Sequence, residues 1–320
     1  MSRTVLVATH GHCFDGMTSA ALFTRLLREL EGEASFQYRA CGYGPHQAGT
    51  DESVLTGDVN AILDFRYLAS PKLDWYFDHH ATAFVTPEDR AHFEQDGGQR
   101  KFFDPAYGSC AKLIYDVSRD KFGLADDETI VELVKWADII DSASFPDAEV
   151  AVSRQEPALQ LMTVVENDGD DAFLTKWIPQ LLERPLHEIA ASDEIQARWK
   201  PLEAQHRAFV ERVRKASQPR GAVVYVDLTD TVTDVVGKFV TYALYPESMY
   251  SVVVSRGKTR CKISIGYNPW CGQARRHDIS AICKRHGGGG HPVVGAISLP
   301  QGDVERAKEL ALAIVEELNR

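Results

Sequence analysis

Acidic and imidazole side chains follow three apolar, strand-like runs in the first quarter of the chain. They are Asp15 after the first run, Asp64 after the second, and the triplet Asp78-His79-His80 after the third. Charge at the end of a buried strand is costly unless a cation or a polar partner compensates it. Each aspartate taken singly is explained equally well by a turn or a helix N-cap. Together they favour a metal centre, because carboxylate oxygen and imidazole nitrogen form a donor set that Mn²⁺ accepts, whereas structural zinc more often recruits paired thiolates.

The elements that would position these side chains alternate between strand-like runs and helical periodicity. This alternation is typical of a mostly parallel α/β sheet with helices on both faces. We expect strands over residues 4–8, 36–39, 61–63 and 75–77, and helices from Asp15, from Ser109 as an N-cap, and from Asp127 through Trp136.

The pattern of expected secondary structure changes twice in the second half of the chain. Residues 155–217 are helical in pattern throughout and include a long polar stretch. The elements expected after it are a strand over 222–226, a helix over 235–244, a hairpin of 251–255 and 260–267, a helix over 278–286, a loop of four glycines, a strand over 293–298 and a helix from 303. The predicted fold class is therefore α/β. It has an N-terminal mostly parallel sheet domain (1–190), a helical linker (191–220) and a smaller C-terminal α/β domain with a mixed sheet (221–320).

Composition excludes several classes of protein. Hydrophobic content of 44% and charged content of 25% are those of an ordinary soluble globular protein. No apolar run approaches the ~20 residues of a membrane span, and the N-terminus lacks a signal-peptide pattern, so we expect a cytoplasmic protein without a membrane partner. The six cysteines form no C-x-x-C pair, which indicates reduced thiols. A net charge of −11 disfavours binding to long duplex DNA, although a local basic pocket can still hold a small anion.

The order of these motifs resembles the DHH phosphoesterase superfamily with a C-terminal DHH-associated domain. The N-terminal motifs fall in family order, and the run Gly287-Gly288-Gly289-Gly290-His291 resembles the glycine-rich signature of the associated domain. The resemblance covers nearly the whole chain. It implies a pair of divalent cations that polarise a phosphoryl group and activate water for in-line attack.

The resemblance also implies roles for the central residues. Asp64 would bridge the two metals and His79 would ligate one of them. His80 would face the scissile phosphate as an electrostatic stabiliser or proton donor. Asp78 would be a ligand or, as we favour, the acceptor that fixes the orientation of an imidazole ring.

Another metal-ligating aspartate is expected after a helix, and the sequence offers two. Asp138 lies at the expected helix end, whereas the run from Asp141 to Phe145 resembles a form of the motif seen in some members. We favour Asp138 and keep Asp141 as the alternative. The residue that does not bind metal would cap a turn or support a ligand.

The first motif departs from the family pattern. Members usually open with a histidine followed by two aspartates spaced D-x-D, but Cys13 stands where the first aspartate is expected and only Asp15 remains. This change removes a hard ligand and adds a soft one, which either shifts preference towards Zn²⁺ or Fe²⁺ or weakens that site. His10 and His12 are available to compensate, and we expect at least one of them to bind metal. The expected cofactor is Mn²⁺, with Zn²⁺, Fe²⁺ and Mg²⁺ as alternatives.

Substrate contacts are expected from the C-terminal region. Exposed backbone N–H groups of a glycine run can hold a phosphate, and a neighbouring histidine or arginine can add charge. The arginine-serine pair with which the family's hairpin strand commonly ends is absent here, so we expect an asparagine to take its place. The predicted substrate-binding set is Gly288, Gly289, Gly290, His291, Asn268 and Arg276.

The function predicted from the sequence is that of a divalent-metal-dependent phosphoesterase acting on a small nucleotide or short oligonucleotide. Among the activities that the resemblance implies, hydrolysis of short oligonucleotides or linear dinucleotides and of adenosine bisphosphate suits this compact, acidic chain. Two alternatives stand beside it: an exopolyphosphatase or pyrophosphatase-like hydrolase, and a nucleotide-binding protein with a degenerate metal site. The sequence leaves a homodimer open.

Overall fold

The computed structural model describes residues 3–43, 51–232, 237 and 239–320. The chain divides into two compact units. The N-terminal unit comprises Met1–Phe145 and Arg154–Leu202, and the C-terminal unit comprises Pro146–Ser153 and Glu203–Arg320. The predicted α/β class is confirmed, with a parallel sheet in the first unit and a mixed sheet in the second. Among the described residues, no helix is both long and apolar enough to cross a membrane.

The N-terminal unit is built on a five-stranded sheet in which every pair of neighbouring strands is parallel. The strands are β1 (Thr4–His10), β2 (Ser35–Cys41), β3 (Val59–Leu63), β4 (Trp75–Asp78) and β5 (Lys101–Phe103). Their order across the sheet is β2-β1-β3-β4-β5. The first four coincide with predicted strands, whereas β5 was not predicted because it is short and begins with lysine.

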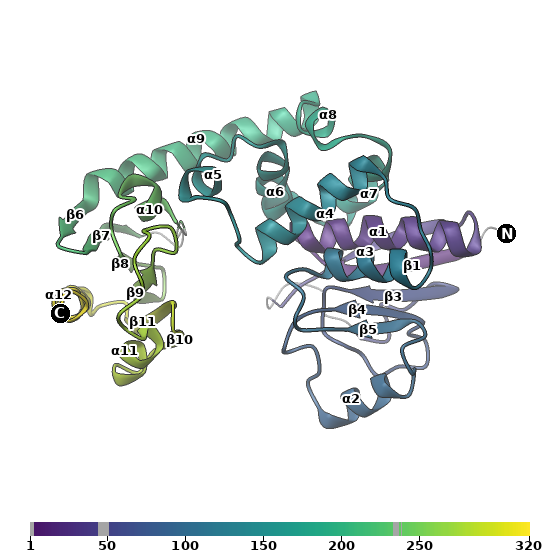
Figure 1. Cartoon of the computed structure of the whole chain (residues 1–320), viewed down its shortest axis with the longest axis horizontal. Helices are drawn as coiled ribbons and strands as arrows, with labels where there is room; N and C mark the ends of the chain where they lie inside the picture. Colours follow the sequence, from purple (N-terminus) through teal and green to yellow (C-terminus); the bar gives the residue numbers. More distant parts are fainter. Residues whose placement is uncertain (1–2, 44–50, 233–236, 238) are drawn as a thin grey trace. The chain divides into compact units, whose positions relative to one another are not determined.

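Both faces of this sheet are covered, as parallel sheets require. Every residue of β3 and of β4 is buried. Helix α1 (Phe14–Glu31) contacts β1 and β3 on one face, and α3 (Cys110–Asp120) contacts β4 (Figure 1). On the other face, Leu6 and Ala8 of β1 pack in an apolar cluster that includes Phe93 of α2 (Pro87–Glu94).

The strand order reverses direction at β1, and this reversal determines where a ligand can bind. The chain leaves β1 towards β2 on one side and returns to β3 on the other. In open α/β sheets, a crevice for ligands forms outside the carboxyl ends of the strands at such a switch point. His10 ends β1, Asp64 directly follows β3, and Asp78 ends β4, so these three predicted site residues lie at the carboxyl ends of the strands beside the switch point.

Helices complete the N-terminal unit. Ser109 caps α3 and Asp127 caps α4 (Glu128–Asp141), each through a side-chain oxygen that accepts a backbone N–H, as predicted. The helical region that follows consists of α6 (Pro157–Asp168), α7 (Asp171–Glu183), α8 (Leu186–Ala190) and α9 (Asp193–Ala216). Helix α9 begins in the N-terminal unit and ends in the C-terminal unit.

The C-terminal unit contains a six-stranded mixed sheet in the order β10-β11-β9-β8-β7-β6. The strands are β6 (Ser217–Arg220), β7 (Val223–Val232), β8 (Tyr250–Arg256), β9 (Arg260–Tyr267), β10 (Gly289–His291) and β11 (Val294–Pro300). Side chains of β8 alternate between the two faces. Val252 and Val254 pack in the cluster that also contains residues of α11 (Ile279–Arg285) and α12 (Val304–Leu318), whereas Val253 packs against the cluster on the opposite face.

Most of the predictions for this unit hold. The hairpin of β8 and β9 and the helices α11 and α12 are confirmed, but β6 and the short helix α5 (Ala148–Ser153) were not predicted. Part of the helix expected over 235–244 falls outside the described residues. The helix that is described, α10, spans Val240–Leu244.

The glycine run is not simply a loop, because Gly289–His291 forms the edge strand β10, antiparallel to β11. Two of its glycines are required by packing. A Cβ at Gly288 would lie 2.2 Å from the carbonyl oxygen of Ala296, and one at Gly290 would lie 2.3 Å from that of Val294. The backbone N–H of Gly288 donates to the carbonyl of Cys283. The glycines therefore serve the sheet, and a phosphate-binding role for them stays a prediction.

Candidate metal centre

Asp64 is the central acidic group of the N-terminal unit. The residue is only 1% exposed, and neither carboxylate oxygen has a hydrogen-bond partner among the described residues. Its backbone is left-handed, with φ 54°, a strained conformation that tends to occur at functional sites. Three imidazoles surround the carboxylate, so a buried acid without a hydrogen bond faces three nitrogen donors.

The two oxygens of Asp64 face different partners. Oδ2 lies 3.5 Å from His10 Nδ1, whereas Oδ1 lies 3.6 Å from both His79 Nε2 and His80 Nδ1. Burial raises the pKa of the Asp64 carboxyl, but the imidazoles of His10, His79 and His80 outweigh burial and lower it. A carboxylate placed in this way can bridge two cations, each bound to one of its oxygens.

His79 is oriented towards the acids by a backbone contact. Its Nδ1 lies 3.1 Å from the carbonyl oxygen of Tyr107, so the N–H on that nitrogen donates there and Nε2 is left for a metal. Nε2 is buried without a hydrogen-bond partner and lies 3.2 Å from Asp141 Oδ2. Burial lowers the pKa of His79, but Asp141 and Asp64 raise it to about 11. A strongly negative local field, which a cation would neutralise, explains this shift.

Asp15 is held by the beginning of a helix. Its carboxylate accepts the backbone N–H groups of Cys110 (2.7 Å) and Ala111 (2.9 Å) at the N-terminus of α3, where the helix dipole favours an anion. Oδ2 also lies 3.9 Å from His79 Nε2. Burial and the charges of Asp64 and Asp141 raise the Asp15 pKa well above its ordinary value. Three acids are therefore crowded together, as in a site that binds cations.

The structure separates the two candidates at the end of α4. Asp141 groups with Asp15 and His79 as donors close enough to hold one ion. Asp138, which the sequence favoured, instead accepts a hydrogen bond from Ser109 Oγ (3.2 Å) and packs so closely on Gly108 that a Cβ there would lie 2.7 Å from its Oδ1. Asp138 thus supports the turn before α3, and Asp141 is the better placed ligand.

Asp78 and His80 form a second polar pair beside this group. Asp78 is fully buried, and its oxygens accept from Tyr76 Oη (2.9 Å), from the His79 N–H (2.8 Å) and from the His80 ring at Nδ1 (2.8 Å). A carboxylate with these partners has little capacity left for a metal. The hydrogen bond to Asp78 is also the main cause of a raised His80 pKa. Asp78 therefore fixes the imidazole of His80 and favours its protonated form; the His80 side chain is 35% exposed.

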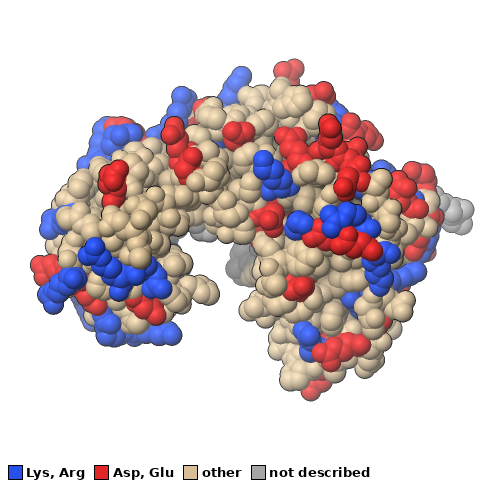
Figure 2. All heavy atoms as spheres, in the orientation of Figure 1, with Lys and Arg blue, Asp and Glu red and all other residues tan. Residues whose placement is uncertain are grey.

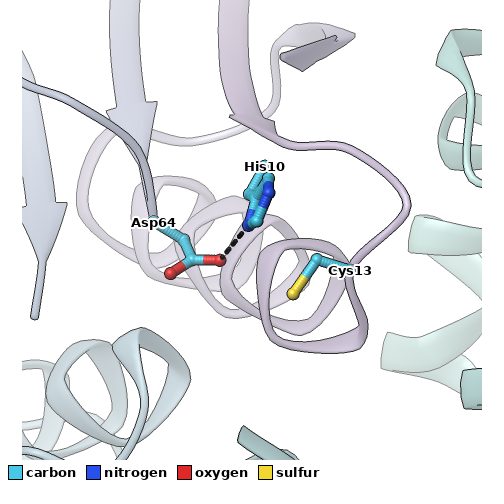
Figure 3. A group of neighbouring side chains, drawn as sticks. All are labelled: His10, Cys13 and Asp64. Atoms are coloured by element: carbon cyan, nitrogen blue, oxygen red, sulfur yellow. Dashed lines mark ion pairs between the residues drawn. The ribbon is translucent and has the colours of Figure 1, made fainter. Parts of the chain in front are cut away.

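The loop between β1 and α1 carries the remaining predicted ligands. His10, Cys13 and Asp64 offer nitrogen, sulfur and oxygen atoms within 4.8 Å of one another (Figure 3). The loop closes tightly because Gly16 has no side chain: a Cβ there would lie 2.1 Å from the His10 carbonyl oxygen. Burial, followed by the charges of Asp64 and Asp15, raises the pKa of the Cys13 thiol.

His12 lies beside a cavity and not in the donor groups. Its backbone is left-handed (φ 53°), its N–H donates to the carbonyl of Gly169 (3.1 Å), and its side chain lines a cavity of about 340 Å³ together with Asp168 and Arg198. It belongs to none of the donor groups formed by the described residues. Of the two histidines predicted to compensate for the lost aspartate, the structure brings His10 to the centre and not His12.

The sequence analysis did not identify a positively charged side chain beside the centre, that of Arg66. Arg66 is exposed, and its guanidinium carbon lies 4.7 Å from the centre of the Tyr43 ring. Tyr43 stacks on Phe65 at 4.3 Å between ring centroids and lies 5.7 Å from His10. No acidic partner of Arg66 is present among the described residues. The available signal was positional: Phe65 and Arg66 directly follow Asp64, and Tyr43 lies just beyond the end of β2, the strand that flanks β1 on its other side.

The predicted substrate residues of the C-terminal unit have different surroundings. Arg276 is exposed, and its backbone N–H donates to Tyr250 Oη (2.9 Å). His291 is exposed in β10. Asn268 is fully buried, and its amide donates to two carbonyls while its oxygen accepts the N–H of Trp270. The side chain of Asn268 ties the turn after β9 to the carbonyls of Pro246 and Ser248, which leaves it little capacity for substrate, so a substrate contact stays a prediction.

Comparison with known proteins identifies the fold. No protein-family model matches the sequence, and no curated protein matches it. Among solved structures, a pGpG-specific phosphodiesterase from Vibrio cholerae is similar over 99% of both chains, with a TM-score of 0.70 and 20% identity. An exopolyphosphatase-related protein from Bacteroides fragilis (TM-score 0.51, 15% identity, 99% of this chain and 93% of that one) has a similar structure. So does the DHH domain of a protein described as a member of a family of ribosomal proteins (TM-score 0.59, 14% identity, 99% and 88%).

The chain has the DHH fold. At these identities the likeness concerns the fold, and it confirms at that level the resemblance predicted from the motifs. The DHH triplet that gives the fold its name is Asp78-His79-His80 in this chain. The donor groups described above lie at the end of the sheet where the triplet stands, and their residue types fit a pair of divalent cations.

Proposed function

We propose that this protein is a divalent-metal-dependent phosphoesterase that hydrolyses phosphate esters of small nucleotides or short oligonucleotides. The observation that carries the proposal is the carboxylate of Asp64. It is buried, neither oxygen has a hydrogen-bond partner among the described residues, and its two oxygens face different imidazoles. A buried carboxylate is costly unless positive charge compensates it, and bound cations would do so together with the imidazoles. Asp15, His79 and Asp141 supply the further donors of one site, and His10 and Cys13 those of the other.

The protein's own groups have distinct tasks in this proposal. Cations bound at the centre would polarise the phosphoryl group and supply hydroxide at neutral pH. His80, held by Asp78 at Nδ1, directs its other nitrogen away from that hydrogen bond, where it can donate a proton to the leaving oxygen. The hydrogen bond to Asp78 raises the pKa of His80, which favours the protonated ring that a proton donor requires. Tyr76 Oη in turn keeps Asp78 in place.

Arg66 offers a site for a second negative group of the substrate. Its guanidinium is held on the Tyr43 ring, which reduces the conformational freedom lost when it binds an anion. It follows Asp64 by two positions, so it lies beside the centre. A planar guanidinium suits bidentate binding of a phosphate. A substrate with one phosphate at the metals and another anionic group nearby fits this arrangement.

Two observations favour a nucleotide. The solved structure with a TM-score of 0.70 is of a pGpG-specific phosphodiesterase. In addition, lysine and arginine outnumber aspartate and glutamate in the C-terminal unit, whereas the N-terminal unit carries the acidic excess. Figure 2 shows several of these basic side chains on the C-terminal unit. Arg276 and His291, both exposed there, are the residues that we propose for substrate binding.

A single assay in Mn²⁺ tests the proposal with three substrates: pGpG, adenosine 3′,5′-bisphosphate and linear polyphosphate. We expect hydrolysis of one or both nucleotides, loss of activity with a chelator, and recovery when Mn²⁺ is restored. Cleavage of polyphosphate alone would overturn the nucleotide claim and favour the second candidate, to which the exopolyphosphatase-related structure is similar. Binding of nucleotide without bound metal or turnover would overturn the enzyme claim in favour of a nucleotide-binding protein.

A further inference from the structure

The two halves of the proposed centre offer chemically different donors. One half contains Asp15, His79 and Asp141, which provide two carboxylates and one imidazole. The other half contains His10, Cys13 and Asp64, which provide an imidazole, a thiol and a carboxylate. Carboxylate-rich sites suit Mn²⁺ and Mg²⁺, whereas thiolate and imidazole together favour Zn²⁺, Fe²⁺ and Co²⁺. The difference arises from one position, because Cys13 occupies the place where the resemblance leads us to expect an aspartate.

The geometry of the His10, Cys13 and Asp64 group fits a tetrahedral ion. At metal–ligand distances near 2.1 Å, neighbouring ligand atoms of a tetrahedral site are about 3.5 Å apart. His10 Nδ1 and Asp64 Oδ2 lie 3.5 Å apart, and the Cys13 sulfur lies within 4.8 Å of both donors. Figure 3 shows the three side chains converging on one space, with the His10–Asp64 pair marked. A small movement of the cysteine side chain therefore completes three ligands.

Two observations besides the cysteine itself indicate a ligand at this place. Asp64 is almost completely buried, and its Oδ2 has no hydrogen-bond partner among the described residues although it points into the group. The loop is also constrained to bring Cys13 there: His12 is left-handed, and the missing side chain of Gly16 lets the loop close over His10. Cys13 occupies the N-cap position of α1, which places its thiol beside His10 and Asp64.

We propose that the centre is asymmetric, with a thiolate-containing site formed by His10, Cys13 and Asp64 that selects a borderline metal such as Zn²⁺, Fe²⁺ or Co²⁺. The other site keeps the harder preference of its carboxylates. Of the two consequences that the sequence left open for Cys13, this is the change of metal preference and not the loss of the site. The inference rests on the metal centre of the proposed function but not on catalysis.

Cobalt(II) titration of the metal-free protein tests this inference directly. A thiolate bound to Co²⁺ gives a charge-transfer absorption band in the near ultraviolet that nitrogen and oxygen ligands do not give. We expect two equivalents of Co²⁺ to bind, with the band developing for only one of them. Cys13→Asp should lose the band while still binding two equivalents. It should also bind Mn²⁺ more tightly and Zn²⁺ more weakly, roughly tenfold or more in each direction.

Cys110→Ala is the matched control. Cys110 is a buried thiol near the centre that donates a hydrogen bond to the carbonyl of Phe77 and belongs to none of the donor groups. This variant should therefore keep the band. A wild-type protein that binds two equivalents without the band, or a band that survives in Cys13→Ala, would overturn the inference and leave the metal centre intact. A wild-type protein that binds no Co²⁺ or Mn²⁺ would instead overturn the proposed function. The outcomes are thus distinguishable, and none depends on turnover.

Discussion

Replacing Asp64 with asparagine should remove most of the stabilisation that Mn²⁺ gives to the N-terminal unit. Asparagine is the appropriate change because it tolerates the left-handed backbone at this position (φ 54°), where alanine would add about 1 kcal/mol or more of strain. It keeps the shape of the side chain and removes its charge. Since both oxygens of Asp64 face donor groups, the substitution weakens both sites at once.

The expected magnitude follows from linkage between binding and folding. At a free Mn²⁺ concentration one hundred times the Kd, binding to the folded state stabilises it by about 2.7 kcal/mol. At about 2–4 °C per kcal/mol for a unit of this size, the Tm rises by about 5–11 °C. Loss of a bridging ligand should cost at least the upper end of the ~10–100-fold in affinity lost when groups supporting a ligand are removed. The same Mn²⁺ concentration then stabilises Asp64→Asn by only about 0.4 kcal/mol, or 1–2 °C.

Thermal unfolding followed by tryptophan fluorescence measures this effect in the intended unit. Four of the five tryptophans belong to the N-terminal unit, namely Trp75, Trp136, Trp177 and Trp199. The matched control is Asp104→Ala. Asp104 also follows a strand of the sheet, but its carboxylate accepts the backbone N–H of Ala106 and is outside the donor groups. The control should keep the full Mn²⁺ shift, and an equal shift in Asp64→Asn and wild type would refute the reasoning.

Three other predictions concern single features. Arg66→Ala should raise the KM for a nucleotide by about tenfold or more, as expected for a charged hydrogen bond worth ~1.5–3 kcal/mol. The control Arg90→Ala removes another arginine stacked on aromatic rings and should leave KM unchanged. If steady-state kinetics gave the same KM for both variants, Arg66 would not contact the substrate. Burial lowers the pKa of His79 but nearby carboxylates raise it to about 11, so the His79 ring is charged at neutral pH in the metal-free protein. Because a metal displaces about one proton from His79, metal affinity should rise between pH 6 and pH 8. Calorimetry in buffers of different ionisation enthalpy measures this proton release, and a heat of binding that is the same in every buffer would disprove it. Gly290→Ala should destabilise the C-terminal unit by about 1–3 kcal/mol, because its Cβ would meet backbone, whereas Gly289→Ala, with open space around it, should cost little; urea denaturation followed by circular dichroism would contradict the packing argument if the two variants unfolded alike.

The sequence was sufficient for four strands of the N-terminal sheet and for the acids near their carboxyl ends. Strands such as β3 and β4 are buried on both faces, so they appear as short apolar runs, and an aspartate after such a run is conspicuous. The carboxyl ends of neighbouring parallel strands meet at one edge, which brings Asp15, Asp64 and His79 together without further information. Short strands with polar or glycine residues, such as β6 and β10, carry no such signal.

Side-chain direction could not be obtained in the same way. Asp138 and Asp141 are three residues apart near the end of one helix, so they point in directions about 60° apart. Which of them faces His79 depends on how α4 packs. The contact of Tyr43 with Phe65 is similar, because it joins residues that follow β2 and β3 and meet only because both strands flank β1. Asn268 is a further example, since a polar residue that follows a strand can use its side chain to join two loops, here through the carbonyls of Pro246 and Ser248.

Anomalous diffraction from a crystal soaked in Co²⁺, which both donor groups can hold, tests whether Asp64 bridges two cations. We expect two anomalous peaks about 3.5–4 Å apart, one on each side of the Asp64 carboxylate. One of them should lie beside Asp15, His79 and Asp141 and the other beside His10 and Cys13. A single peak remote from Asp64, or no peak at a saturating concentration, would show that Asp64 does not bridge two cations.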